Sequence, residues 1–138
     1  MSRVPLEIGD HTTFSKTISE SDVYMLCGIT GDFNRAHLNE AYMQSTNYGK
    51  RIAPGMLSLG YSTAAATSMV NELDMTAVSF GYDKVRFIRP TFIGDTLTVK
   101  YTVKEIDHEK LTAVATVRIY NQHEKLCTSA RHITKYVS

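Results

Sequence analysis

The sequence has no tryptophan, only two cysteines, an almost balanced charge and no long apolar run. Cys27 and Cys127 lack the close spacing of metal ligands and lie in apolar patterns. We therefore expect buried thiols in a reducing compartment rather than a disulfide. The net charge of +1 argues against general attraction to nucleic acid or to an anionic membrane.

Two further absences bear on where the protein works. No stretch approaches the roughly 20 apolar residues that a membrane span needs, and the N-terminus has no apolar signal core. The sequence therefore predicts a cytoplasmic protein without a membrane partner. Four of the histidines show no metal-ligand spacing, and we interpret them as structural or surface residues: His11, His108, His123 and His132.

The chain length and composition are those of a globular domain. Hydrophobic residues make up 43% of the sequence and charged residues 21%. Neither an internal repeat nor a linker is visible. A chain of this size predicts one domain over residues 1–138 with a substantial core.

The N-terminal third reads as short elements around an irregular segment. We expect a strand over residues 11–17 and a helix that is capped by Ser19 and ended by Gly28. Residues 31–37 are too rich in Gly, Asp and Asn for a regular element. A second short helix is expected over residues 39–45.

The rest of the chain predicts one long helix followed by strands. The helix runs from Gly55 to about Leu73 and carries small residues on nearly every face, which predicts close neighbours around most of its circumference. A curved sheet wrapped around this helix would explain the pattern. Period-two alternation predicts an antiparallel meander, with a β-bulge at Asp83–Lys84, over residues 78–87, 97–103, 111–119 and 126–136. The fold class is α+β.

Two motifs suggest chemistry. Asp32 and His37 lie five positions apart on the irregular segment, with Asn34 between them, and such a pair can act on one water or one acidic proton. Gly55-Met56 opens the long helix and offers backbone N–H groups that can hold a developing oxyanion. Alone, however, Asp32 is more typical of a turn cap, and His37 of a surface or core histidine.

The spacing of these motifs resembles a known family. Asp32-x-Asn34-x-x-His37, followed by Ile52-Ala53-x-Gly55-Met56, is similar to the signature of the MaoC-like, or R-specific, enoyl-CoA hydratases. Residues 87–97 are similar to that family's strand–turn–strand segment. The chain departs from the family at Arg35, where proline is usual, and at Pro54, where histidine is usual. Loss of the first proline is expected to loosen the loop, while Pro54 fixes a backbone angle before the helix.

The resemblance implies a hotdog fold, with an antiparallel sheet wrapped around a central helix. It also implies syn hydration of a trans-2-enoyl thioester to an R-3-hydroxyacyl thioester, or the reverse. Asp32 and His37 would hold one water, with the roles of acid and base left open between them, and Asn34 would orient a partner. The Gly55 N–H would stabilise the enolate oxygen.

The resemblance carries four further expectations. A family hydroxyl in the central helix falls on Thr63, with Ser62 as the neighbouring possibility, although packing is the commoner use of such a residue. No metal or redox cofactor is needed, because the CoA or acyl-carrier arm belongs to the substrate. The family's usual assembly predicts a homodimer or a dimer of dimers. Candidates for phosphate contacts, otherwise a solvated strand face, are Lys84, Arg86 and Arg89.

Two other functions compete with the hydratase. A hotdog thioesterase also needs a carboxylate, but usually without a histidine partnered in this way. A non-catalytic acyl-CoA-binding subunit would explain the departures at Arg35 and Pro54.

Overall fold

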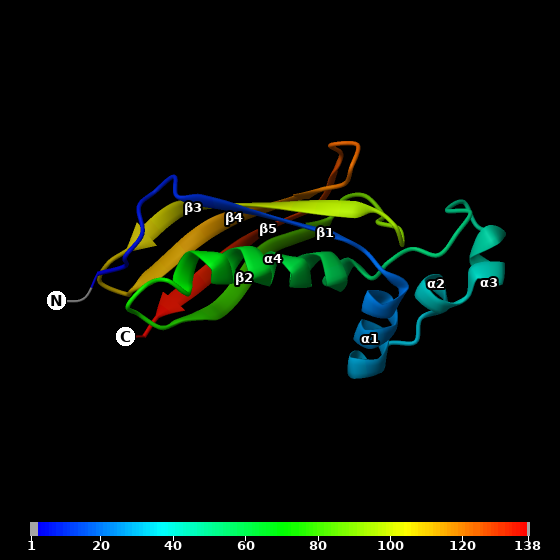
Figure 1. Ribbon diagram of the computed structural model, residues 1–138, viewed down its shortest axis with the longest axis horizontal. Helices are drawn as coiled ribbons and strands as arrows, with labels where there is room; N and C mark the ends of the chain where they lie inside the picture. Colours follow the sequence, from blue (N-terminus) through cyan, green and yellow to red (C-terminus); the bar gives the residue numbers. More distant parts are fainter. Residues whose placement is uncertain (1–2, 138) are drawn as a thin grey trace.

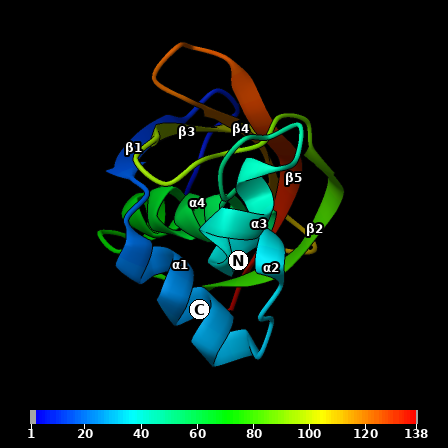
Figure 2. The ribbon, with the colours of Figure 1, turned by 90° about the vertical axis from the view of Figure 1, so that its right-hand side faces the viewer.

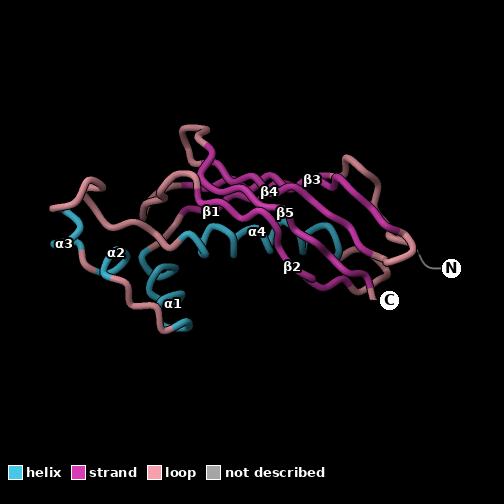
Figure 3. Tube along the Cα trace, turned by 180° about the vertical axis from the view of Figure 1, so that it is seen from behind, coloured by secondary structure: helices cyan, strands magenta, loops and turns pink. Residues whose placement is uncertain are grey.

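One long helix lies against a curved antiparallel sheet in the computed structural model, which describes residues 3–137. Figure 2 shows the sheet curving over and down one side of α4. The three short helices gather beyond the N-terminal end of α4, and both termini lie at the opposite end (Figures 1 and 3). The elements are, in chain order, β1 His11–Thr17, α1 Glu20–Thr30, α2 Arg35–Leu38, α3 Glu40–Gln44, α4 Gly55–Val70, β2 Ala77–Phe87, β3 Thr96–Asp107, β4 Thr112–Tyr120 and β5 Leu126–Tyr136.

The strand order is β1-β3-β4-β5-β2, with every pair antiparallel. Strands β3 to β5 form the predicted meander, but the prediction is wrong for β2, which pairs with β5 at the far edge. The connection from β2 to β3 contains Pro90 and cannot be a tight hairpin. Its next residues are held beside the start of α4, where Ala53 N donates to Thr91 O at 2.7 Å and Ile52 bridges Phe92.

The core confirms the period-two pattern of the later strands. The inward side chains of β3 and β4 are buried: Leu97, Val99, Tyr101, Val103, Ala113, Ala115, Val117 and Ile119. The predicted bulge in β2 is present, because the register shifts between Asp83 and Arg86 and Lys84 has a φ of 53°. Both cysteines are buried and free, as expected. Among residues 3–137, no helix is long and apolar enough to cross a membrane.

Within the part of the chain that the structure describes, only one side of α4 is covered. The buried side includes Leu57, Ser58 and Ala65, and the small side chains of Ser58 and Ala65 allow the sheet to approach closely. The prediction of neighbours around most of the helix is wrong for the single chain, because the sheet reaches only part of its circumference. The uncovered side is a stripe of exposed residues, which we call the open stripe: Met56, Gly60, Thr63 and Thr67.

Helix α1 begins as predicted but ends later. Ser19 Oγ accepts a hydrogen bond from Asp22 N at 3.0 Å, which is the expected N-cap. Gly28, the predicted end, stays within the helix. The left-handed residue that ends α1 is Gly31, with a φ of 77° and an N–H that donates to Cys27 O at 2.9 Å.

The segment over residues 31–37 is not wholly irregular. His37 lies on the single turn of α2, which Asn34 caps by accepting a hydrogen bond from Ala36 N at 2.9 Å. Asn39 then caps α3 through Tyr42 N, also at 2.9 Å, so the second short helix is confirmed. Because each turn begins at an asparagine, side-chain caps fix the path of this segment where long-range packing is sparse.

Asp22 anchors α1 to the central helix. Tyr61, which is buried on α4, donates to Asp22 Oδ2 at 2.6 Å, and Lys16 pairs with the same carboxylate. Burial raises the pKa of Asp22, but hydrogen bonds from Lys16, Tyr61 and Ser19 outweigh it and lower the pKa from 3.8 to about 2. The ionised carboxylate therefore stabilises the folded chain.

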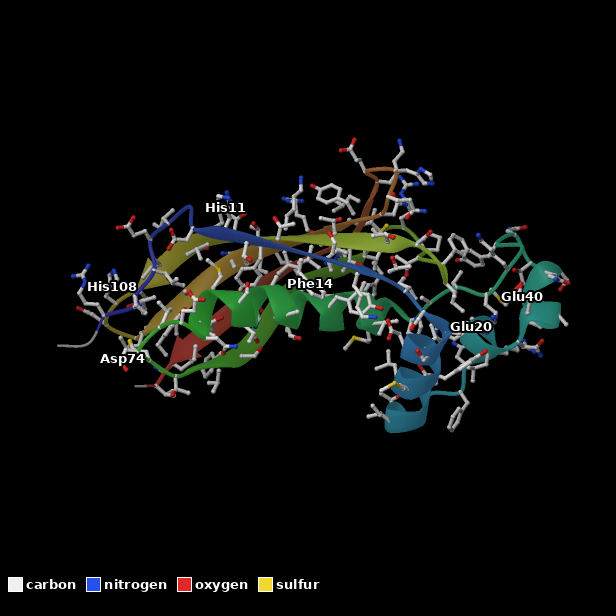
Figure 4. All side chains as sticks on the ribbon, viewed as in Figure 1. His11, Phe14, Glu20, Glu40, Asp74 and His108 are labelled. Carbon is white, nitrogen blue, oxygen red and sulfur yellow. The ribbon has the colours of Figure 1, made fainter. Side chains whose placement is uncertain are left out.

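This anchor predicts a pH-dependent loss of stability. Because the pKa of Asp22 is lower in the folded state, its contribution is complete above the unfolded pKa of 3.8 and disappears as the pH falls towards about 2. Replacing Asp22 by asparagine should cost about 1–2 kcal/mol at neutral pH, allowing for solvent screening of the partly exposed Lys16. Urea unfolding at pH 7 and pH 2.5 would measure both effects. Asp74→Asn, an exposed carboxylate at the opposite end of the molecule (Figure 4), is the matched control. An equal cost of Asp22→Asn at both pH values would contradict the prediction.

Candidate active site

The predicted acid–base pair and the start of the central helix share one cavity. It has a volume of about 340 Å³ and lies between the end of α1, the segment carrying α2, and the first turn of α4. Its lining residues are Leu26, Cys27, Thr30, Asp32, His37, Pro54, Gly55, Met56 and Phe87. A more open concavity of about 800 Å³ lies under the N-terminal segment, but it contains neither member of the predicted pair.

Local hydrogen bonds hold Asp32 in position. The N–H of Asp32 donates to Thr30 Oγ1 at 3.2 Å, and Asp32 Oδ1 accepts from Asn34 N at 3.3 Å. These bonds fix the backbone directly after Gly31, where α1 ends. The carboxylate itself remains exposed at the rim of the cavity and is accessible to a ligand.

His37 is buried and held in one orientation. Its Nδ1 lies 2.8 Å from the carbonyl oxygen of Ile52, in the segment that leads to α4. Because a carbonyl oxygen only accepts hydrogen bonds, Nδ1 must carry the proton of the neutral ring. Nε2 is then the nitrogen available to accept or return a proton. The bond also links α2 directly to the start of the central helix.

The first turn of α4 is open to a ligand at its N-terminus. Pro54 occupies the N-cap position with a φ of −59° and makes no side-chain hydrogen bond to the helix. The N–H groups of a first helical turn have no partner within the helix, and the helix dipole places positive charge at this end. An oxyanion in the cavity would meet these groups at Gly55.

Gly55 also allows an aromatic wall to approach the helix. A β-carbon placed on Gly55 would lie 2.7 Å from Cδ1 of Phe87, well inside van der Waals contact. Phe87 is about half-exposed and lies at the end of β2, so its ring closes one side of the cavity against the glycine backbone. Any larger residue at position 55 must displace this ring.

Replacing Gly55 by alanine should therefore disturb the site more than the fold. We expect turnover to fall by at least roughly tenfold, since loss of a complete oxyanion donor costs about 10²–10³. The double variant Gly55→Ala/Phe87→Ala removes the clash and should recover part of the loss. Steady-state kinetics of the wild type, both single variants and the double variant would measure this. Equal turnover of Gly55→Ala and the wild type would contradict the prediction.

The structure does not bring every predicted site residue into the cavity. Asp32, His37, Gly55 and Met56 line it, whereas Asn34 caps α2 from outside. Thr63 lies further along α4 on the open stripe and lines a separate cavity of about 80 Å³.

The neighbouring Ser62 is buried, and its hydroxyl donates to Leu59 O. The three candidates for phosphate contacts, Lys84, Arg86 and Arg89, are exposed.

The departures from the family motif have local explanations. Arg35 occupies the first position of α2, where proline would fit well, and its guanidinium lies 3.9 Å from the centre of the Tyr42 ring. This stacking fixes α2 against α3. The loop therefore gains a contact in place of the proline ring that the family usually has at position 35. Pro54 is buried directly before α4 and has a φ of −59°, which agrees with the expected fixed backbone angle.

Several lining residues have no signal in the sequence. Phe87 was identified only as a strand residue, and Leu26 and Cys27 only as members of a helix. Burial raises the pKa of the Cys27 thiol, and the charge of Asp32 raises it further, so the thiol stays protonated at neutral pH. It therefore contributes an apolar wall rather than a nucleophile.

Comparison with known proteins agrees with this geometry. The MaoC like domain family matches residues 5–125. An (R)-specific enoyl-CoA hydratase of Rhodospirillum rubrum is 39% identical over 102 residues, which are 74% of this chain and 69% of the relative. A 3-hydroxybutyryl-CoA dehydratase of Methylorubrum extorquens is 34% identical over 78% of this chain and 67% of its own length. The solved (R)-hydratase of A. caviae superposes with a TM-score of 0.86 at 25% identity, covering 95% of this chain and 97% of that one.

These matches define the class of the protein. The α+β architecture is the hotdog fold of the hydratase and MaoC structures. The chain belongs to the MaoC-like family. It is an enzyme of the hydro-lyase class, which adds water to a carbon–carbon double bond or removes it.

Proposed function

We propose that this enzyme hydrates trans-2-enoyl-CoA to (R)-3-hydroxyacyl-CoA and catalyses the reverse dehydration. The observation that carries the proposal is the common cavity of Asp32, His37 and Gly55. The relatives named as hydratases and as a dehydratase support this substrate class.

The proposed chemistry needs three groups around the thioester. Asp32 and His37 hold one water between them, and one of the two takes a proton as the water attacks Cβ. The other supplies a proton to Cα on the same face of the double bond. The Gly55 N–H stabilises the negative charge that develops on the thioester oxygen. The CoA or acyl-carrier arm is part of the substrate, and we propose that neither a metal nor a redox cofactor takes part.

We also propose that the chain works as a single hotdog domain in the cytoplasm and forms a homodimer. Strand β2 is an edge of the sheet and exposes Val78 and Phe80, with relative exposures of 45% and 67%. The open stripe of α4 lies on the uncovered side of the same helix that the sheet packs against. A second copy would bury both features, which a single chain leaves in water.

The proposal is tested with crotonyl-CoA and two simultaneous readouts. We expect loss of the absorbance of the conjugated enoyl thioester without release of free thiol, and an R product on chiral analysis. Release of one free thiol for each conjugated thioester that is lost would identify a thioesterase instead. Tight binding without either change, also with longer and branched enoyl thioesters, would identify a non-catalytic binding subunit.

A further inference from the structure

One arginine binds side chains from several of the segments that surround the proposed acid–base pair. Arg51 lies just before α4, and its side chain is only 15% exposed. Its guanidinium pairs with Glu20 in the first turn of α1, and its Nε lies 3.2 Å from Glu40 Oε1 in the first turn of α3. Figure 4 labels both glutamates, which lie at the same end of the molecule.

The cluster is more than a pair of surface ion pairs. The backbone N–H of Arg51 also donates to Glu40 Oε1 at 3.1 Å, and Arg51 Nη1 donates to the Tyr24 hydroxyl at 3.1 Å. Tyr24 in turn donates to Glu20 at 3.3 Å. The side-chain hydrogen bond from Arg51 lowers the pKa of Glu20, and its backbone hydrogen bond lowers the pKa of Glu40, so both stay ionised at neutral pH.

The two glutamates bracket the proposed catalytic segment. Asp32 and His37 both lie in the chain between Glu20 and Glu40, so one guanidinium closes this stretch into a loop. Helix α1 has other anchors, because Val23 and Cys27 are buried and Asp22 binds Tyr61. Helix α3 buries only Met43, so its position depends strongly on Arg51.

The residue after Arg51 is the one that orients His37. Ile52 N donates to Ala36 O at 3.0 Å, and Ile52 O accepts from His37 Nδ1 at 2.8 Å. A shift of Arg51 would therefore move the carbonyl group of Ile52, and with it the imidazole ring that donates to this carbonyl. The same peptide stretch continues to Gly55, so the clamp also sets the distance from the pair to the start of α4.

We propose that Arg51 is a positioning residue, which clamps α1 and α3 onto the peptide that orients His37 and so presents Asp32 and His37 together to the substrate. The proposal rests on the hydratase function above. Arginine suits this place better than lysine, because its planar fork makes several directed hydrogen bonds at once. Misplacement of a catalytic group by about 1 Å costs roughly 10²-fold in rate.

The test compares Arg51→Met and Arg51→Lys with the wild type, with Glu40→Ala as a milder variant that removes only the arm to α3. We expect Arg51→Met to lower kcat on crotonyl-CoA by roughly 10²-fold with KM within about threefold, and Arg51→Lys to restore only part of the loss. Glu40→Ala should fall between Arg51→Met and the wild type. Val117→Ala, a buried change in β4, controls for lost stability alone.

A second readout does not depend on turnover. With ¹⁵N-labelled histidine, the ring N–H of His37 that bonds to Ile52 should give a protected downfield proton signal, assigned by its loss in His37→Asn. This signal should shift or broaden in Arg51→Met and stay unchanged in Val117→Ala. A wild type that fails to hydrate any enoyl thioester would overturn the proposed function, and the His37 signal alone would then decide the role of Arg51. If Arg51→Met lowers only the unfolding temperature, while kcat and the His37 signal keep their wild-type values, the proposal is overturned.

Discussion

Asp32→Asn is expected to reduce hydration of crotonyl-CoA by roughly 10²–10⁴-fold, the usual range for loss of an acid–base group. Asparagine keeps an oxygen that can accept the hydrogen bond from Asn34 N, so the loop should retain its path. What is lost is the ability to exchange a proton with water or substrate. We therefore expect the decrease in kcat, with KM and the unfolding temperature close to wild type.

Asp10→Asn is the matched control for this substitution. Asp10 also accepts a backbone hydrogen bond in a turn, from Glu7 N at 2.9 Å, but it lies outside the cavity of the pair. Its replacement should leave turnover unchanged. The assay follows the absorbance of the conjugated thioester at several substrate concentrations. Turnover of Asp32→Asn within about threefold of wild type would remove Asp32 from the acid–base chemistry, because genuine loss of such a group is far larger.

His37→Asn should have an effect of the same size, roughly 10²–10⁴-fold on turnover. The asparagine amide can occupy the place of Nδ1 and still donate to Ile52 O, while nothing replaces Nε2. The variant thus separates orientation from proton transfer.

An exposed histidine provides the comparison. His123 lies in the turn between β4 and β5, far along the chain from the cavity, and His123→Asn should keep wild-type kinetics. If His37→Asn keeps turnover within about threefold of the wild type, the imidazole takes no part in the rate-limiting proton transfer, because loss of an acid–base group costs far more.

Much of the fold follows from local patterns in the sequence. The bounds of β1 and β5 agree with the alternation of residues and the turns beside them, because a strand with one buried face repeats every second residue. Ser19 and Asn39 mark helix starts for an equally local reason, since a short side chain must accept a hydrogen bond there. The end of α1 was misplaced because both Gly28 and Gly31 can take a left-handed conformation, and only packing decides between them.

Long-range features were less predictable. The place of β2 beside β5 depends on where the connection after Pro90 is held, and that connection contacts the residues before α4. Hydrophobic periodicity records which face of a strand is buried, but it does not identify the neighbouring strand. The open stripe of α4 was missed for a related reason, because small residues suit both a packed face and an uncovered one.

For the candidate site, too, the residues that lie close in the sequence were predictable and the distant ones were not. Asp32, His37 and Gly55 were found through their spacing, and the structure places them in one cavity. Phe87 and the contacts of Arg51 with Glu20 and Glu40 were not predicted, because the partners are distant in the sequence. Arg51 is 31 residues from Glu20 and 11 from Glu40, and no periodic pattern connects them.

The most direct test of the central claim is a double-mutant cycle on kcat/KM with Asp32→Asn, His37→Asn and the combined variant. If the two groups act as a unit on one water, kcat/KM of the combined variant should be no more than about tenfold below that of the less active single variant. A combined loss equal to the product of the two single losses would show that the groups act independently, and would contradict the shared acid–base site.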